Sequence, residues 1–496
     1  MERRTVLRGL AGVPLGAMAV VSAAGRAGAA DYNVVVDPAP GWGAATWEGW
    51  GTSLGWWANQ LGPREDLADL FFTRKTVAFR GEQVPGLGMN IVRYCAGASG
   101  TNVVEGRRMV RQNEQLDGFK QIEGFQRDWY SADPYSASFD WTADANQRAV
   151  LQLAKARGAD TFELFANSPQ WWMLKNDDPT GAADGSCNLQ DGNFGRHAAY
   201  LATVARYAHD HWGIDFASVQ PMNEPGMGWG APGVSRGQEG CSYSQEQQAE
   251  LIRLTRAQLD ARDLSGTIVT GLDEYAYSWA ANTWTSPAFD AATRAAVGRV
   301  SVHGYEFYED RDALYRVVAA DGKKIWQSEY GDDDPGGLVL ARNLNWDIRW
   351  LRASAWLVWQ ILDWHTYGPI TLTGGVLGAV NPKYYVLAQY MRHIRPGMRI
   401  VDSGHPDAVA AYDDANHKLV VVAVNHGPGQ WINFDLSRFG QPGRDGALVR
   451  RWVTGTLPES GEHYRQYEDT YLHGSRFWTE CGADTVQTFE IEDVHL

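Results

Sequence analysis

GRHAAYLATVARYAHDHWGIDFASVQPMNEP, residues 195–225, joins a helical pattern to an apolar strand. Its first part has the residue spacing of a helix and predicts one over Gly195–His211. The next run, Ala217–Met222, is short and apolar, which predicts a buried strand. This strand leads directly into Asn223-Glu224-Pro225. A helix followed by a buried strand that ends at an acidic residue is therefore the unit from which the rest of the chain can be interpreted.

Short apolar runs alternate with helical segments from about residue 47 to residue 395. The expected strands are Trp47–Thr52, Gly88–Tyr94, Thr161–Ala166, Ala217–Met222, Thr267–Leu272, Val300–Gly304, Lys324–Glu329 and Ala355–Ile361. The clearest helical patterns are Thr142–Arg157, Gly195–His211, Ser244–Ala261 and Ala288–Val297. Eight strands alternating with helices predict an α/β protein with a parallel sheet, most simply a (β/α)8 TIM barrel.

The pattern changes after residue 395, where strand-like runs are separated by Gly, Asp, Asn and Pro. These runs predict a C-terminal antiparallel β-sandwich. They are Ile400-Val401, Ala408–Tyr412, Lys418–Asn425, Trp431–Leu436, Ala447–Val453 and Val486–Ile491. A lone strand, Tyr32–Asp37, precedes the barrel and is expected to join the sandwich. The expected organisation is an export signal at 1–30, this N-terminal strand at 31–40, the barrel at 41–395 and the sandwich at 396–496.

Composition excludes several classes of protein. The chain has 496 residues, 44% hydrophobic and 21% charged, which is typical of a globular protein. A net charge of -15 argues against a nucleic-acid partner, which needs basic surface. Beyond residue 30 no run approaches the roughly 18 apolar residues of a membrane span. The 22 Trp residues outnumber the 16 Phe, which favours either core filling or stacking on sugar rings.

Residues 1–30 have the features of an export signal. Arg3-Arg4 precede an apolar run over Leu10–Ala24, and small residues follow at Ala27–Ala30. The paired arginines resemble a twin-arginine signal, and an ordinary secretory signal is the alternative. Both interpretations predict that the protein leaves the cytoplasm of a bacterium and is extracellular.

The four cysteines match no compact metal motif. They are Cys95, Cys187, Cys241 and Cys481. Cys187 and Cys241 both lie in Gly-rich stretches with the composition of loops, so we expect them to pair in a disulfide. Cys95 ends an apolar strand and is expected to be a free buried thiol.

Two acidic residues follow strands four and seven of the expected barrel. Glu224 ends the fourth strand region, and Glu329 ends the seventh in Ile325-Trp326-Gln327-Ser328-Glu329-Tyr330. Chemistry in such barrels occurs at the carboxyl ends of the strands, and strands four and seven face each other across that end. Hydrolysis of a glycosidic bond needs two carboxyls, and a separation of roughly 5 Å means retention through a covalent intermediate. Either acid alone is typical of a solvated residue that leaves a strand, whereas the pair favours catalysis.

Other acidic residues are rivals for a role in the cleft. Asp273 and Glu274 follow the fifth strand, where either one could line a substrate cleft, and Asp363 follows the eighth. Asp332-Asp333-Asp334 lies just after Glu329 and is interpreted as a solvated loop rather than a calcium site.

Four further side chains are candidates to support the glutamates. Arg93 ends the second strand, where a cation would keep one carboxylate ionised; a structural ion pair is the alternative. Asn223 can donate to a sugar hydroxyl beside the reacting carbon. His303 and Tyr305 end the sixth strand next to Glu329, and either can hydrogen-bond the nucleophile. For His303, a buried core histidine is the alternative interpretation.

Tryptophans gather at the same strand ends. This clustering favours sugar stacking over scattered core packing. The residues concerned are Trp56, Trp57, Trp171, Trp172, Trp229, Trp359 and Trp364.

Four motifs together resemble glycoside hydrolase family 30. The motifs are Gly49-Trp50-Gly51-Thr52-Ser53-Leu54, Asn167-Ser168-Pro169-Gln170-Trp171-Trp172-Met173, Asn223-Glu224-Pro225 and Gln327-Ser328-Glu329-Tyr330-Gly331. The resemblance covers essentially all of the chain after the export signal. It implies a (β/α)8 barrel with a fused β-sandwich, Glu224 as acid/base and Glu329 as nucleophile.

Within that family, Gly51–Ala58 looks most like the endo-β-1,6-galactanase branch. The resemblance implies a retaining enzyme that cleaves β-1,6-galactan side chains of arabinogalactan. This chemistry requires no cofactor or metal, and we expect the protein to be a monomer. Two alternatives stay open. One is a β-1,6-glucanase or another family 30 β-glycosidase, and the other is an inactive carbohydrate-binding protein.

Overall fold

The structure is a computed structural model of the chain. It describes residues 32–39, 46–110, 116–234, 237–305 and 310–496. The expected export signal, residues 1–30, lies outside the described residues.

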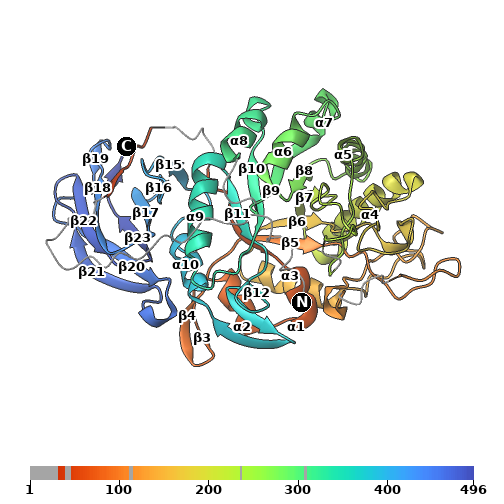
Figure 1. Cartoon of the computed structure of the whole chain (residues 1–496), viewed down its shortest axis with the longest axis horizontal. Helices are drawn as coiled ribbons and strands as arrows, with labels where there is room; N and C mark the ends of the chain where they lie inside the picture. Colours follow the sequence, from red (N-terminus) through yellow and green to blue (C-terminus); the bar gives the residue numbers. More distant parts are fainter. Residues whose placement is uncertain (1–31, 40–45, 111–115, 235–236, 306–309) are drawn as a thin grey trace, which may run out of the picture.

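Eight parallel strands close into a barrel in the order β10-β11-β2-β5-β6-β7-β8-β9 (Figure 1). They are β2 (Gly49–Ser53), β5 (Ile91–Cys95), β6 (Thr161–Phe165), β7 (Phe216–Gln220), β8 (Ile268–Glu274), β9 (Val297–His303), β10 (Ile325–Tyr330) and β11 (Ala355–Val358). Each of the eight corresponds to one expected strand, so the predicted (β/α)8 barrel is confirmed. In order along the chain, β7 is barrel strand four and β10 is barrel strand seven.

The barrel strands are apolar because both of their faces are covered. Every residue of β5 and β10 is buried, as is typical of a parallel sheet wrapped by helices. The fourth strand ends at Gln220, two residues before its expected end, because Pro221 has no backbone N–H to continue the ladder. The residues after it, including Glu224, are thereby released into a loop at the carboxyl end of the barrel.

Helices surround the barrel, and the four expected ones are present with shifted ends. The described helices are α1 (Gly55–Leu61), α2 (Glu65–Phe72), α3 (Ala145–Ala156), α4 (Phe194–Tyr207), α5 (Gln245–Asp260), α6 (Tyr277–Trp284), α7 (Ala291–Ala296), α8 (Arg311–Ala320), α9 (Leu338–Trp346) and α10 (Pro382–Met391). The four expected helices are α3, α4, α5 and α7. The helix α5 begins with a capping box in which Ser244 and Gln247 satisfy each other's backbone N–H groups. None of the helices in the described residues is long and apolar enough to cross a bilayer.

Two sheets form the C-terminal sandwich, and their strands pair in antiparallel fashion with one exception. The larger sheet has the order β15 (Arg399–Val401), β16 (Ala408–Asp413), β17 (Lys418–Asn425), β23 (Thr485–Ile491), β20 (Leu448–Gly455) and β21 (Arg465–Tyr471). The smaller sheet has the order β1 (Tyr32–Val35), β18 (Gln430–Asp435) and β22 (Arg476–Cys481). The exception is the N-terminal strand β1, which pairs in parallel with β18, so it joins the C-terminal sandwich as expected.

The larger sheet buries both of its faces. Alternate residues of β17, such as Val421, pack with the smaller sheet, while Val420 and Val422 pack with the barrel core. The helices α9 and α10 lie between the barrel and this sheet (Figure 1). Gln389 of α10 donates to Thr454 of β20 across this boundary at 2.8 Å. The sandwich therefore packs directly against the barrel.

The sequence patterns do not predict two strands of the sandwich, β21 and β22. The strand β21 carries charged and polar residues on most positions, and β22 alternates exposed and buried residues. Both lie at the edge of a sheet, where a strand does not need an apolar run. Further short strands form small hairpins and bridges: β3 (Thr76–Phe79), β4 (Glu82–Pro85), β12 (Leu362–Asp363), β13 (Ile370–Thr373), β14 (Val376–Val380), β19 (Gln441–Pro442) and β24 (Val494–His495).

The cysteines differ in one respect from expectation. All four are free thiols, so the expected Cys187–Cys241 disulfide is absent from the structure. The two thiols are nevertheless neighbours, because the Cys187 and Cys241 side chains share a hydrogen bond. Cys95 is a buried free thiol, as predicted.

Candidate active site

Glu224 lies in the loop after β7, with its backbone held in a left-handed conformation at φ 45°. Its N–H donates to the carbonyl of Asp273 at 2.9 Å, and its own carbonyl accepts from Trp229 Nε1 at 3.1 Å. A non-glycine residue in this region is strained and persists only where its surroundings fix it. The side chain is 6% exposed, so a substrate can reach only a small part of it.

Glu329 lies on β10, where the pairing with β9 shifts register between Gln327 and Glu329. Such a shift re-aims the side chain that follows it. Glu329 Oε2 accepts from Arg93 Nη1 at 3.2 Å, and Oε1 accepts from the Tyr305 hydroxyl at 2.9 Å. The side chain is 5% exposed.

The two glutamates face each other closely. One carboxylate oxygen of Glu224, one of Glu329 and one ring nitrogen of His303 all lie within 4.8 Å of one another. Grouped donors of this kind can also bind a metal ion, which requires a neutral imidazole. Here both nitrogens of His303 face carboxylates: Nδ1 lies 3.0 Å from Glu224 Oε1, and Nε2 lies 3.3 Å from Asp273 Oδ1. The arrangement therefore suits proton sharing between acids better than metal ligation.

The surroundings of His303 favour its charged form. Burial alone would lower the pKa of His303, but the Glu329 and Asp273 carboxylates outweigh it and hold that pKa well above its ordinary value. An imidazolium donates from both nitrogens. Of the two residues expected to hydrogen-bond Glu329, Tyr305 does so, whereas the carboxylate oxygen closest to His303 belongs to Glu224.

Arg93 is fully buried in the middle of β5, not at its end as expected, and contacts three carboxylates. Its Nε lies 3.0 Å from Glu163, its Nη2 lies 2.7 Å from Asp273, and its Nη1 lies 3.2 Å from Glu329. The guanidinium also packs on the Phe165 ring, with 4.2 Å between the guanidinium carbon and the ring centroid. The same guanidinium therefore forms structural ion pairs with Glu163 and Asp273 and also contacts the Glu329 carboxylate.

Asn223 lies beside Glu224 and is buried. Its amide oxygen has no hydrogen-bond partner among the described residues. A buried amide oxygen without a partner costs free energy. The amide is therefore available to a ligand hydroxyl next to the acid.

Asp273 and Glu274 do not line the cleft, contrary to expectation. Asp273 is fully buried beneath the glutamates, and Glu274 accepts from the backbone N–H of Gly226 and from Gln248, each at 3.0 Å. Burial raises the pKa of Glu274 to about 7. Glu274 consequently anchors the loop that follows Glu224.

The remaining rival acids lie outside the glutamate pair. Asp363 is partly exposed and accepts from the Trp364 backbone N–H at 2.7 Å. Asp332 is not simply solvated, because its carboxylate lies 2.9 Å from the buried ammonium of Lys383.

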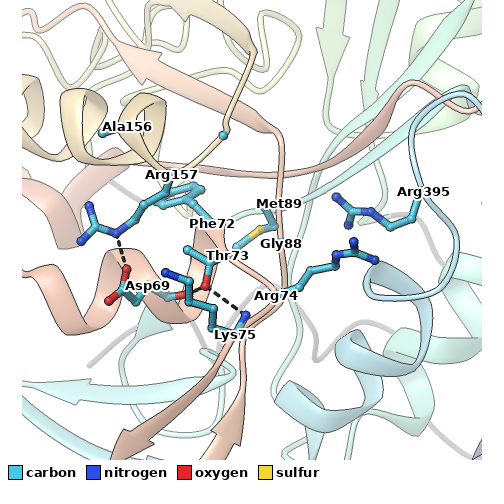
Figure 2. A pocket seen from close by; sticks show the side chains of 11 residues that line it. Asp69, Phe72, Thr73, Arg74, Lys75, Gly88, Met89, Ala156, Arg157 and Arg395 are labelled. Carbon is cyan, nitrogen blue, oxygen red and sulfur yellow. Dashed lines mark hydrogen bonds and ion pairs between the residues drawn. The ribbon is translucent and has the colours of Figure 1, made fainter.

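A separate cavity of about 510 Å³ lies at the amino ends of the barrel strands (Figure 2). Arg74, Lys75 and Arg395 line it, together with Arg157, which is paired with Asp69 at 2.6 Å. It lacks two facing carboxyls and lies at the end of the barrel where such folds do not place their chemistry. The glutamate pair is therefore the candidate active site.

Comparison with known proteins agrees with this assignment. A family model described as O-Glycosyl hydrolase family 30 matches residues 41–288. The chain is 43% identical over 488 residues to an endo-beta-1,6-galactanase of Hypocrea rufa, covering 98% of this chain and 99% of that protein. The chain belongs to O-glycosyl hydrolase family 30.

Other proteins are similar to this family 30 hydrolase in sequence or in structure. An exo-beta-1,6-galactobiohydrolase of Bifidobacterium longum is 26% identical over 442 residues, covering 70% of this chain and 28% of that protein. The crystal structure of a conserved exported protein from Bacteroides fragilis matches with a TM-score of 0.72 at 18% identity, covering 92% and 99% of the two chains. A family 30 xylanase from Clostridium acetobutylicum matches with a TM-score of 0.67 at 19% identity, covering 93% and 99%. The two structural matches bear on the fold alone.

Most of the expected sugar-stacking tryptophans of this hydrolase are core residues. Trp57, Trp171 and Trp172 are buried in the main barrel core, so they support the strand ends instead of presenting a face to substrate. Trp229 is also buried, where it holds the Glu224 carbonyl. The clustering of these four tryptophans therefore reflects burial near the strand ends and not an exposed stacking surface.

Trp56 and Trp359 occupy a different position. They form an edge-to-face pair with 5.3 Å between ring centroids, in a small cluster with Cys95 and Phe165 next to Arg93. Each is nearly buried, with only a narrow exposed edge. Trp364 is more than half exposed, and its ring is tilted against that of His365.

The sequence analysis misses several residues that shape the site. Glu163 and Arg299 form a buried ion pair behind Arg93. A charged residue in the apolar strand Thr161–Phe165 is a signal that could have revealed Glu163. Tyr275 stacks on Tyr305 with 5.2 Å between ring centroids, but neither its position nor its contact is readable from spacing.

Proposed function

We propose that the chain is a retaining endo-β-1,6-galactanase that cleaves the galactan side chains of arabinogalactan. The observation that carries the mechanism is the separation of the Glu224 and Glu329 carboxylate oxygens, which is within 4.8 Å. Retaining glycosidases hold their carboxyls about 5–5.5 Å apart, whereas inverting enzymes leave room for a water between them. The substrate assignment is supported by the 43% identity to an endo-beta-1,6-galactanase over nearly the whole length.

The contacts of each glutamate support distinct roles. Arg93 and Tyr305 both donate to Glu329, and donors to a carboxylate favour its ionised form. These donors oppose the burial that raises the pKa of Glu329 to about 7, so we assign Glu329 as the nucleophile and Glu224 as the acid/base. The His303 contact occupies Oε1 of Glu224 and leaves Oε2 for the glycosidic oxygen of a substrate.

The reaction then proceeds in two displacements. Glu329 attacks the anomeric carbon while Glu224 protonates the departing glycosidic oxygen, which gives a covalent glycosyl-enzyme. Glu224 then deprotonates a water that attacks the same carbon and releases Glu329. The Asn223 amide, whose oxygen has no partner among the described residues, binds a hydroxyl of the reacting sugar.

Export completes the proposal. Arabinogalactan is an extracellular polysaccharide, and an enzyme that acts on it must leave the cytoplasm. The Arg3-Arg4 pair and the apolar run that follows it support export by the twin-arginine route.

A product profile tests the proposed substrate. The mature protein is incubated separately with arabinose-trimmed β-1,6-galactan, β-1,6-glucan and xylan, and the oligosaccharides are resolved over time. We expect a ladder of galacto-oligosaccharides from galactan alone. Release of one small product from the start would indicate exo action, and release only from glucan or xylan would contradict the substrate.

A further inference from the structure

Asp273 is the residue on which the contacts of the active site converge. Its carboxylate is fully buried and receives three donors from three different strands. Arg93 Nη2 lies 2.7 Å from Oδ2, Ser328 Oγ donates to Oδ1 at 2.7 Å, and His303 Nε2 lies 3.3 Å from Oδ1. Because no part of Asp273 is exposed, it cannot touch a substrate.

Each of these donors leads to a glutamate of the pair. Arg93 continues to Glu329, and Ser328 directly precedes Glu329 in the chain. His303 continues to Glu224. The backbone adds a direct link, since the Glu224 N–H donates to the Asp273 carbonyl.

The local backbone is built to place Asp273 there. The pairing of β8 with β9 shifts register between Leu272 and Glu274, so Asp273 is the extra residue. Leu272 and Asp273 both have positive φ angles, 75° and 52°. The pairing of β10 with β9 shifts in the same way around Ser328, and the two irregular positions are joined by the Ser328–Asp273 hydrogen bond. Strain of this kind is typical of sites where side-chain position matters more than stability.

We propose that Asp273 is a positioning residue for the hydrolysis, because its carboxylate holds Arg93, His303 and Ser328 in the orientation that presents them to Glu224 and Glu329. The inference rests on the proposed glycosidase function. It predicts that the charge of Asp273, and not only its volume, sets the protonation of the pair.

The groups that face His303 determine how it responds to loss of this charge. Glu224 faces it from the loop after β7, Asp273 from β8 and Glu329 from β10, and Arg93 of β5 lies behind Asp273. Without the Asp273 carboxylate, His303 loses one of the anions that keep it protonated. The positive charge of Arg93, no longer balanced by Asp273, then stabilises the ionised form of Glu329 more strongly. Both changes make the site lose its protons at lower pH.

The variant Asp273→Asn tests this by steady-state kinetics on galactan. We expect kcat to fall on the order of 10²-fold, the lower end of what a positioned acid–base group contributes, with KM little changed. The alkaline limb of the pH profile should move to lower pH. An unchanged alkaline limb, or a loss confined to KM, would overturn the proposal.

Asp347→Asn is the matched control. Asp347 is equally buried and pairs with Arg311 at 2.7 Å, but it contacts neither glutamate. It should lose thermal stability as Asp273→Asn does, while its pH profile stays that of the wild type. If both variants shift the profile alike, the effect is structural and the proposal fails.

A measurement on the wild type does not depend on any variant folding or on the substrate assignment. Nitrogen-15 NMR of labelled histidines should show His303 with both ring nitrogens protonated at pH 7. A neutral His303 would overturn the positioning role. If instead His303 is charged but galactan, glucan and xylan are all left intact, the proposed function fails while the Asp273 contact stands.

Discussion

Asp273 and Asp347 are two fully buried carboxylates with the same kinds of partner and different consequences. Asp273 accepts from Arg93 and Ser328 at 2.7 Å, whereas Asp347 accepts from Arg311 at 2.7 Å and from Tyr277 at 2.6 Å. Both satisfy the rule that a buried charge must be paired. The difference between them lies in what their partners contact next.

The protonation of the two residues reflects that difference. Burial alone would raise the pKa of Asp273, but Arg93 and His303 outweigh it and hold that pKa well below its usual range. Burial raises the pKa of Asp347, because Arg311, Tyr277 and Trp356 together do not compensate for it. Asp273 lies at the carboxyl end of β8 below Glu224 and Glu329, while Asp347 follows α9 outside the barrel. A buried ion pair becomes part of a site when its partners reach groups that a substrate can touch.

The largest effect should come from the nucleophile. Glu329→Gln removes the attacking oxygen and should lower kcat by about 10⁴-fold or more, with sugar binding largely retained. In contrast, Asp347→Asn should cost about 3–5 kcal/mol of unfolding free energy by removing the buried carboxylate that faces Arg311, with kcat little changed. Turnover assays and chemical denaturation measure the two. Unchanged turnover in Glu329→Gln would break the comparison.

The acid/base should give a smaller and rescuable loss. Glu224→Ala removes general acid–base catalysis, worth about 10²–10⁴-fold. Added azide, which needs no deprotonation, should restore release of the sugar from the glycosyl-enzyme when the substrate has a good leaving group. The product should then be a glycosyl azide of retained configuration. Azide rescue of Glu224→Ala with a retained product, and of Glu329→Ala with an inverted product, fits the expected roles; the reverse pattern would exchange them.

The pH dependence should report the shared proton. Burial raises the pKa of Glu329 to about 7, opposed by His303 and Arg93 and supported by Glu224. The two carboxyls together therefore keep one proton until the pH rises through about 7. Since the reaction needs one protonated and one ionised glutamate, kcat/KM should fall above about pH 7. A profile that stays flat well into alkaline pH would contradict this assignment.

The smallest effect should come from the edge of the cleft. Trp279 of α6 is 40% exposed, and its ring lies beside Gly226 in the loop after Glu224. If it stacks on a sugar, Trp279→Ala should raise KM about three- to tenfold with kcat unchanged. Trp431→Ala, which removes an exposed indole from the distant sandwich strand β18, is the control. Equal KM values for both variants would show that Trp279 does not bind substrate.

The sequence alone predicts the barrel and the glutamate pair because both follow local patterns. Buried parallel strands are continuous apolar runs, and Glu224 and Glu329 directly follow two of them. The edge strand β21 lacks such a run and was missed. The same logic explains the tryptophans: a motif places Trp171 and Trp172 at a strand end but does not say which way each indole points.

The network around Asp273 could not be predicted in the same way. Its contacts join β5, β9 and β10, which are separated by up to 236 residues of sequence between Arg93 and Glu329. They also depend on a left-handed backbone conformation at Leu272. A leucine in the sequence gives no local signal for that conformation. Contacts of this kind arise only once the barrel closes.

Trapping of the glycosyl-enzyme tests the central claim most directly. The protein is incubated with a 2-fluoro-galactoside that has a good leaving group, digested with pepsin and examined by mass spectrometry. The account predicts one sugar adduct per chain, located on the peptide that contains Glu329, and none in Glu329→Gln. An adduct on Glu224, or inversion of the anomeric centre without any adduct, would contradict it.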